Sequence, residues 1–324
     1  MSNLLVGLLG ALLATNQPVA VSNLAHQTAD VAAPVADLND PVEQEYQKLL
    51  EADDTSQEAV DRLIRENEAF AAEGAGLSGP AVRQRLRDHF APVQKAYEDF
   101  LKRHPDHARA RLAYGSFLND LKDEDGAHDQ WEKARQLDPK NPAAWNNLAN
   151  YYGHNGPVTN AFDYYAKAIA LNPNEPVYYH NFGTTVYLFR KDAMDHFKIN
   201  EPQVFDKALD LYARALQLDP QDFPLATDIA QTYYGIKPPR TDEALLAWNY
   251  ALKIARDDIE REGVYIHFAR VKLNAGRFDE ARRHLDAVTN ALYAELKRRV
   301  LRSLETKETE ARRTNAPAAS VGKK

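Results

Sequence analysis

The sequence contains no cysteine among its 324 residues. This absence excludes disulfide bonds, zinc sites built on thiolates, thiol catalysis and a lipid-modified N-terminal cysteine. It is compatible with an oxidising compartment but does not require one. The sequence also lacks a nucleophile elbow, a phosphate-binding loop, a zinc-protease helix motif and a kinase signature. We therefore expect no enzyme, and we predict no catalytic residues, no metal site and no cofactor.

The chain also has no excess of basic side chains over acidic ones. The chain has 40 Lys and Arg against 47 Asp and Glu, which gives a formal net charge of −7 at pH 7. A general attraction for nucleic acid does not follow from this balance, and we expect no nucleic-acid partner. Acidic side chains dominate residues 30–73, and basic ones dominate residues 297–324. The acidic stretch is either a solvated helix face or a docking patch for a basic partner.

Long apolar runs are scarce. The run from Leu4 to Ala14 is too short to cross a membrane as a helix, which needs about 20 residues, so we expect no stable transmembrane segment. The small residues Ala20 and Ser22 follow it, a pattern typical of a secretory signal, although no Lys or Arg precedes the run. We predict a signal peptide at 1–22, a linker at 23–39 and a periplasmic or secreted protein. The alternative is a tail or docking helix at the N-terminus of a cytoplasmic protein.

Two helices are expected before the periodic part of the chain. Asp40 and Pro41 favour a helix start, and Thr55 with Ser56 favours the start of a second helix. Residues 74–79 spell G-x-G-x-x-G, but a helical pattern precedes them and Pro80 follows. A dinucleotide fingerprint must follow a strand, so this stretch is predicted to be a flexible linker.

A periodic pattern of small and aromatic residues organises the rest of the chain. From Asn141 to Asn174 it consists of Trp145, Leu148, Ala149 and Tyr152, then Ala161, Tyr165, Ala168 and Pro173. This spacing predicts two helices joined by a tight turn at 153–157, with small residues where the helices touch. The proline recurs after 34 residues (173 − 139), and the pattern resembles a tetratricopeptide repeat, whose period is about 34 residues.

Five such units are recognisable, and the third contains an insertion at 188–205. The units are 108–141, 142–175, 176–222, 223–258 and 262–290. The resemblance implies an all-α, right-handed α-solenoid in which stacked hairpins bury each other's apolar faces. We expect an acidic helical region with a degenerate N-terminal cap at 40–107, a C-terminal capping helix at 291–313 and a disordered tail at 314–324. We expect the first helix of this unit to extend through Met194, and the insertion is either a packed elbow or a protrusion that binds a partner.

The resemblance also implies a concave groove lined by the first helix of each unit. The positions that line it in this family correspond here to Asn146, Asn147, Asn150, His180, Asn181, Thr184, Asp228, Gln231, His267 and Arg270. Asparagine can donate to and accept from a peptide backbone. Asn147 and Asn181 hold the same position in consecutive units and resemble the asparagine ladder with which some members hold extended peptides. The alternative is a face that is polar only because it is wet.

We therefore expect a non-enzymatic scaffold for protein–protein interaction. Its partner would be a protein or peptide that places an extended segment or a helix in the groove. The alternative is an accessory subunit of an enzyme or of a cell-envelope assembly complex.

Overall fold

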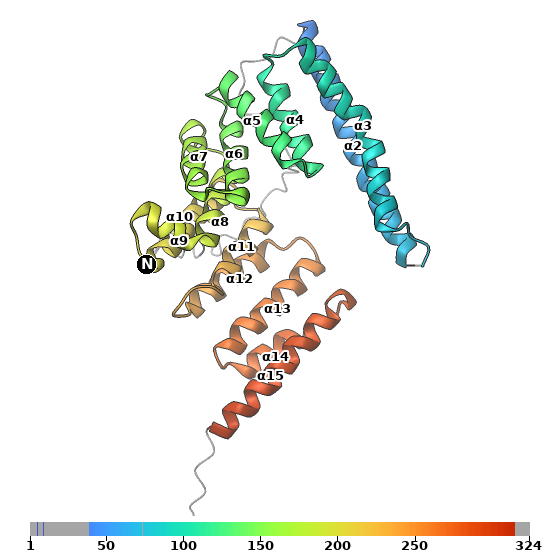
Figure 1. Cartoon of the computed structure of the whole chain (residues 1–324). Coiled ribbons are helices and arrows are strands. Elements are labelled where there is room, and N and C mark those ends of the chain that lie inside the picture. Colours follow the sequence, from blue (N-terminus) through green and yellow to red (C-terminus); the bar gives the residue numbers. More distant parts are fainter. Residues whose placement is uncertain (1–4, 6–8, 10–38, 73, 315–324) are drawn as a thin grey trace, which may run out of the picture. The chain divides into compact units, whose positions relative to one another are not determined.

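The computed structural model describes residues 5, 9, 39–72 and 74–314, and all regular structure in this part of the chain is helical. This confirms the all-α class expected from the periodicity. The chain divides into two compact units, whose helices are labelled in Figure 1. The N-terminal unit is described from residue 39 to Tyr178. The C-terminal unit is described from Tyr179 to residue 314 and includes Leu5 and Leu9.

The N-terminal unit consists of a long helix pair followed by two shorter hairpins. Its helices are α2 (Pro41–Ala72), α3 (Gly79–Arg103), α4 (Ala108–Asp120), α5 (Glu124–Leu137), α6 (Pro142–Asn155) and α7 (Val158–Leu171). Helices α2 and α3 run side by side, and the predicted linker at 74–79 joins them (Figure 1). Helices α4 and α5, and likewise α6 and α7, pack as pairs, as the spacing predicts for consecutive repeats.

Helix α2 differs from the expectation because it runs for 32 residues without stopping at Thr55. The Thr55 hydroxyl donates to the Glu51 carbonyl one turn earlier, at 2.7 Å, instead of capping a new helix. Ser56 faces α3, where its hydroxyl donates to the His89 carbonyl at 3.5 Å. Packing against α3 therefore overrides the local capping preference of these residues.

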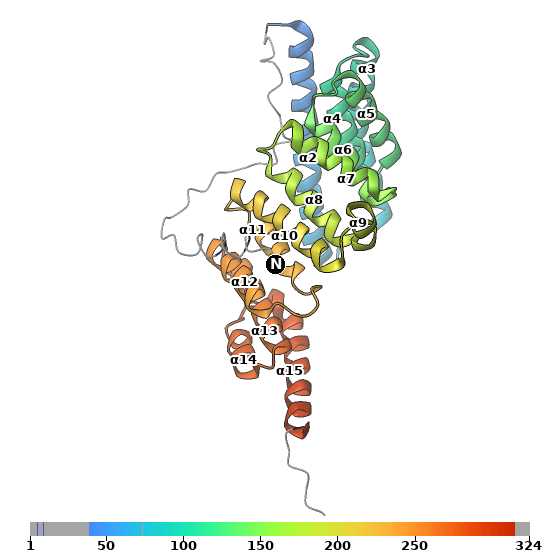
Figure 2. The ribbon, with the colours of Figure 1, turned by 90° about the vertical axis from the view of Figure 1, so that its left-hand side faces the viewer.

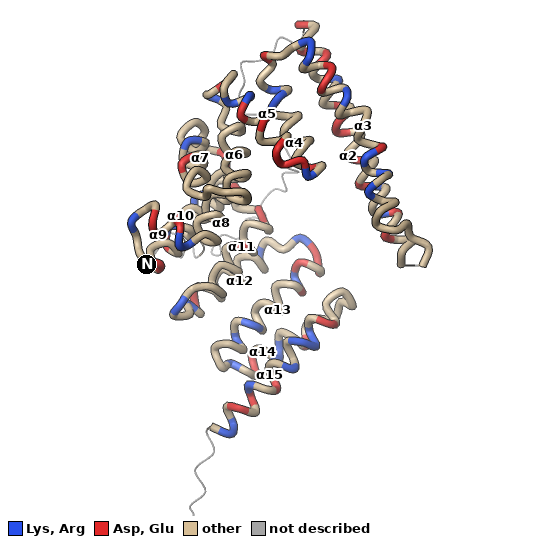
Figure 3. Tube along the Cα trace, in the orientation of Figure 1, with Lys and Arg blue, Asp and Glu red and all other residues tan. Residues whose placement is uncertain are grey.

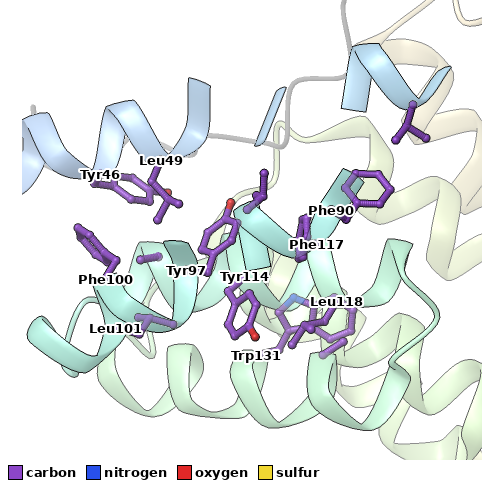
Figure 4. Packing of buried hydrophobic residues seen from close by; sticks show 14 of the residues in the cluster. Tyr46, Leu49, Phe90, Tyr97, Phe100, Leu101, Tyr114, Phe117, Leu118 and Trp131 are labelled. Carbon is purple, nitrogen blue, oxygen red and sulfur yellow. The ribbon is translucent and has the colours of Figure 1, made fainter. Parts of the chain in front are cut away.

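The core of the N-terminal unit is a cluster of aromatic and aliphatic side chains shared by α2, α3, α4 and α5 (Figure 4). Tyr97 and Tyr114 stack with their ring centroids 5.1 Å apart. Trp131 of α5 lies on Gly115 of α4, where an added Cβ would meet the indole at 2.5 Å. The small residue in the first helix thus makes room for the large one in the second. This close approach is the packing that the small-residue positions predicted.

The C-terminal unit begins inside α8 (Pro176–Leu188). Its further elements are α9 (Arg190–Phe197), α10 (Glu201–Leu218), α11 (Phe223–Thr232), α12 (Thr241–Ile254), α13 (Asp258–Asn274), α14 (Phe278–Asp286), the 3₁₀ turn η1 (Ala291–Tyr293) and α15 (Ala294–Thr314). Helices α11 and α12 pack as a pair, as do α13 and α14. The ring of Tyr212 in α10 lies against Gly183 in α8, which repeats the small-against-aromatic contact of the other unit.

The insertion forms a packed elbow, although its first helix does not extend through Met194 as expected. Helix α8 ends at Leu188, and α9 starts after Phe189. Ala193 of α9 is fully buried, and the Lys207 ammonium of α10 lies 4.3 Å from the ring centroid of Phe197. Helix α9 is thus folded back onto α10.

Helix α15 covers the last hairpin. Figures 1 and 2 both show it beside α13 and α14, and its buried Val300 and Leu304 belong to the same apolar cluster as Ile266 of α13 and Leu285 of α14. It begins at Ala294, after η1, rather than at residue 291. Because the end of a repeat stack would otherwise expose an apolar face, α15 acts as the predicted cap.

Candidate partner-binding face

The ten lining residues predicted from the sequence all lie on first helices of hairpins. They are Asn146, Asn147 and Asn150 on α6, His180, Asn181 and Thr184 on α8, Asp228 and Gln231 on α11, and His267 and Arg270 on α13. The α6 residues belong to the N-terminal unit and the others to the C-terminal unit. The structure thus divides the predicted site into two polar faces, one in each unit.

In the N-terminal unit, the α6 side chains differ in what they can offer a ligand. Asn146 is only 7% exposed and donates to Asn147 at 3.3 Å, so it supports its neighbour rather than facing solvent. Asn147 in turn donates to the Ser116 hydroxyl on α4 at 3.5 Å. This contact connects the first helices of two consecutive hairpins.

The Asn150 side chain is held in place by a tyrosine from the second helix of the same hairpin. The Tyr165 hydroxyl donates to its Oδ1 at 2.6 Å. Within the described residues, no acceptor lies within hydrogen-bond distance of the Asn150 amide nitrogen. The side chain is therefore fixed in orientation while its two N–H donors stay free.

The same arrangement recurs in the C-terminal unit. Thr184 of α8 lies 3.0 Å from the hydroxyl of Tyr212, which is the counterpart of Tyr165 in its hairpin. Burial raises the pKa of Tyr212 to about 12, so the phenol is protonated at neutral pH. Polar lining residues of both units are thus positioned by a buried tyrosine one helix deeper.

A histidine–carboxylate pair connects the next two first helices. His180 Nε2 of α8 lies 2.9 Å from Asp228 Oδ2 of α11. One turn further along α11, the Gln231 side chain is exposed and makes no hydrogen bond to any described residue. The face therefore offers a free amide beside a paired acid.

On α13, His267 is built into an aromatic cluster. Its ring stacks on Trp248, with centroids 4.1 Å apart and planes 12° apart, and its Nδ1 lies 3.1 Å from the Tyr234 hydroxyl. Burial, together with the nearby Arg270 guanidinium, lowers the pKa of His267 to about 4. The Arg270 guanidinium lies 4.8 Å from the Tyr234 ring centroid. At neutral pH the imidazole is uncharged, so Arg270 is the cation of this helix face.

The supporting aromatic residues were not among the predicted site residues. The sequence pattern marks Tyr165 only as a recurring apolar position of a second helix, and Tyr212 and Trp248 hold the same position in later units. Their hydroxyl and ring contacts to the lining depend on how two helices cross, which the repeat spacing does not specify. Their recurrence at one repeat position was nevertheless a signal that could have been used.

The described residues contain no helix that is both long and apolar enough to cross a membrane. Over the same part of the chain, no group of three or more His, Asp or Glu side chains is arranged to hold a metal ion.

The helices pack in consecutive pairs, with a small residue of the first helix against a large residue of the second, and the first helices carry a polar face. These features define the class of helical repeat proteins. A family model described as "Tetratricopeptide repeat" matches residues 94–134 and 125–176. The first match begins inside α3, so it includes the second half of the predicted N-terminal cap. Residues 94–176 of this chain therefore match the tetratricopeptide-repeat family.

Of three similar solved structures, PilW supports this helical fold. PilW, described as a widely conserved type IV pilus biogenesis factor, is 16% identical, with a TM-score of 0.53 over 75% of this chain and 98% of its own. YrrB, described as a TPR protein with an unusual peptide-binding site, is 16% identical, with a TM-score of 0.47 over 66% of this chain and 99% of its own. MamA is 24% identical, with a TM-score of 0.43 over 55% of this chain and 95% of its own. No curated protein matches the chain.

Proposed function

We propose that this protein is a non-enzymatic scaffold that binds an extended peptide segment or a partner helix on the polar faces of its first helices. The observation that carries the proposal is the anchoring of lining side chains by buried tyrosines. Asn150 accepts from Tyr165 and keeps its amide N–H groups free, and Gln231 is exposed with its whole amide free. Repeat proteins of this class use such extended faces for recognition.

Anchoring matters because binding orders side chains, and each flexible side chain that becomes fixed costs about 0.5–1.5 kcal/mol. A side chain that is already held loses less freedom when the partner arrives. The Asn150 amide is such a group, because its oxygen is committed to Tyr165 and its nitrogen can donate to a peptide carbonyl. A face that is polar only because solvent covers it would not require a buried tyrosine to fix its side chains.

The experiment compares partners recovered by the full chain and by variants of the lining. Asn150→Asp keeps an oxygen to accept from Tyr165 and removes the two free N–H donors, and it is combined with Gln231→Glu. Asn249 lies exposed on the second helix α12, so Asn249→Asp is the matched control. We expect the double variant to bind its recovered partner at least about tenfold more weakly, because each lost hydrogen bond contributes about 0.5–1.5 kcal/mol. Equal affinity for the double variant and the control would reject the proposal.

Recovery of the partner also distinguishes the alternative role, an accessory subunit of an enzyme or of a cell-envelope assembly complex. An enzyme or an envelope component that co-purifies stoichiometrically with the wild-type chain supports this alternative. A set of unrelated proteins that share one short peptide motif supports the general scaffold.

For localisation we propose export to the periplasm or secretion, with residues 1–22 as the signal peptide. This segment lies outside the described residues except for Leu5 and Leu9, which are helical and 0% and 1% exposed. The alternative is a docking helix that stays attached in a cytoplasmic protein, and this alternative would account for the burial of the two leucines. N-terminal sequencing of the mature protein decides between the two, because export predicts a new terminus near residue 23 and docking predicts retention of Leu5 and Leu9.

A further inference from the structure

A cleft of about 350 Å³ lies between α13 and the capping helix α15 in the C-terminal unit. Its polar lining consists of Arg270 and Asn274 from α13 and Arg299 and Ser303 from α15. No Asp or Glu belongs to the lining. Two guanidinium groups thus share one concave site without a carboxylate.

Both arginines are exposed, and neither has an ion pair with any described residue. Arg270 lies over the Tyr234 ring, and the Arg299 side chain makes no hydrogen bond within the described part of the chain. Two other arginines of α15 are each paired with a carboxylate of the same helix: Arg298 lies 2.9 Å from Glu295, and Arg312 lies 2.7 Å from Glu308. Figure 3 shows that α15 carries both acidic and basic residues.

The rest of the cleft is apolar or offers hydrogen-bond donors. Leu273, Leu296 and Val300 form the apolar part, and Leu273 and Val300 are buried. The Ser303 hydroxyl has no hydrogen bond to a described residue. The Asn274 oxygen accepts from Lys307 at 2.9 Å, so its amide N–H groups are the part left to offer a ligand. The site therefore fits a negatively charged group attached to an apolar one.

We infer that this cleft binds a carboxylate of an acidic peptide segment, with an apolar side chain of the same peptide packed on Leu273, Leu296 and Val300. Arginine recognises carboxylates through paired N–H donors, and such charge-assisted bonds are about twice as strong as neutral ones. A peptide is favoured over nucleic acid because the lining is apolar beside the two guanidiniums and the chain carries a net charge of −7. The inference rests on the proposed function and names the chemistry of its partner.

Arg270 connects this cleft to the predicted lining, since it is both a residue of the α13 face and a wall of the cleft. A peptide that lies on the α11–α13 face can therefore place an acidic residue or its C-terminal carboxylate between α13 and α15. The capping helix then has a second role in recognition besides covering the last hairpin.

The test uses the full chain labelled with ¹⁵N and follows the arginine Nε–H resonances by NMR. The probe is the dipeptide acetyl-Leu-Glu with a free C-terminal carboxylate, titrated beside acetyl-Leu-Gln-amide, which has no carboxylate. We expect the resonances of Arg270 and Arg299 to shift with the acidic dipeptide only. Arg299→Gln should weaken the affinity about tenfold or more, because hydrogen bonds to charged groups contribute about 1.5–3 kcal/mol. The matched control is Arg298→Gln on the same helix, which removes an arginine already paired with Glu295.

Equal shifts with both dipeptides, or equal affinities of the Arg298 and Arg299 variants, would overturn the inference. A third titration with a DNA duplex completes the design, and binding of the duplex in place of the dipeptide at these resonances would overturn it as well. The proposed function is tested separately by Asn150→Asp with Gln231→Glu. Loss of partner in that variant without any dipeptide binding leaves the scaffold in place and removes only the carboxylate cleft.

Discussion

Lowering the pH should destabilise the C-terminal unit through His267. This imidazole is packed between Trp248 and Tyr234, and its pKa is lowered from 6.5 to about 4 by burial and by the nearby Arg270 guanidinium. In the unfolded chain the same imidazole is in water and takes up a proton near pH 6.5. The unfolded state therefore binds more protons than the folded state between these two values.

The sign and size follow from that difference. The contribution of neutral His267 is fully present above pH 6.5, is lost as the pH falls, and stops changing below about pH 4. The full loss is about 3 kcal/mol, since one pKa unit corresponds to about 1.4 kcal/mol. Between pH 7.5 and pH 5 the expected loss is about 2 kcal/mol of unfolding free energy.

Two measurements check this. Imidazole NMR of the full chain should show His267 titrating near pH 4. Urea unfolding at pH 7.5 and pH 5, read by circular dichroism, should show a smaller pH dependence for His267→Gln than for the wild type, by about 2 kcal/mol. Burial also lowers the pKa of His284, which adds a loss in the same direction, so only the difference between wild type and variant isolates His267. The exposed His154→Gln serves as the control. A His267 titration near 6.5, or an unchanged pH dependence in the variant, would refute the reasoning.

Three further outcomes follow from single contacts. Gly115→Ala should lower the unfolding free energy by about 1–3 kcal/mol in urea titrations, because its Cβ would lie 2.5 Å from the Trp131 indole; a stabilised variant would contradict the packing. Tyr97→Phe removes the 2.6 Å hydrogen bond to the buried Asp53 carboxylate and should cost about 1–3 kcal/mol by the same measurement, whereas an unchanged stability would show that the contact is dispensable. Glu262→Ala removes the carboxylate that accepts two backbone N–H groups just before η1, so amides of α15 should exchange faster with deuterated water; unchanged exchange would mean that the cap is held by its apolar contacts alone.

The local sequence pattern predicted the helices well, but it did not predict where a helix is continuous and where it is interrupted. The Asp40–Pro41 start of α2 and the Asn200 start of α10 lie where capping rules place them, and the Asn200 amide N–H and side chain exchange hydrogen bonds with Gln203. The expected new helix at Thr55 does not exist, because packing against α3 keeps α2 continuous. Conversely, the first helix of the insertion breaks at Phe189 although nothing in its spacing marks the break.

For the candidate site, the sequence predicted which residues lie on first helices but not what holds them. The positions of Asn150 and Arg270 follow from counting along the repeat. The hydroxyl that fixes Asn150 belongs to a neighbouring helix, and Arg299, which shares a cleft with Arg270, lies 29 residues further along (299 − 270). These pairings depend on the angle and distance at which helices pack.

The sequence by itself determined that this protein is built from helix hairpins with small residues at their contacts, because a helical repeat of apolar side chains is a local property of 3.6 residues per turn. Only the tertiary structure decided that buried tyrosines anchor the polar lining and that two unpaired arginines share a cleft under the capping helix. The reason is physical: periodicity determines which face a side chain occupies, whereas its partners depend on the packing of separate helices, which side-chain volumes and crossing geometry determine together.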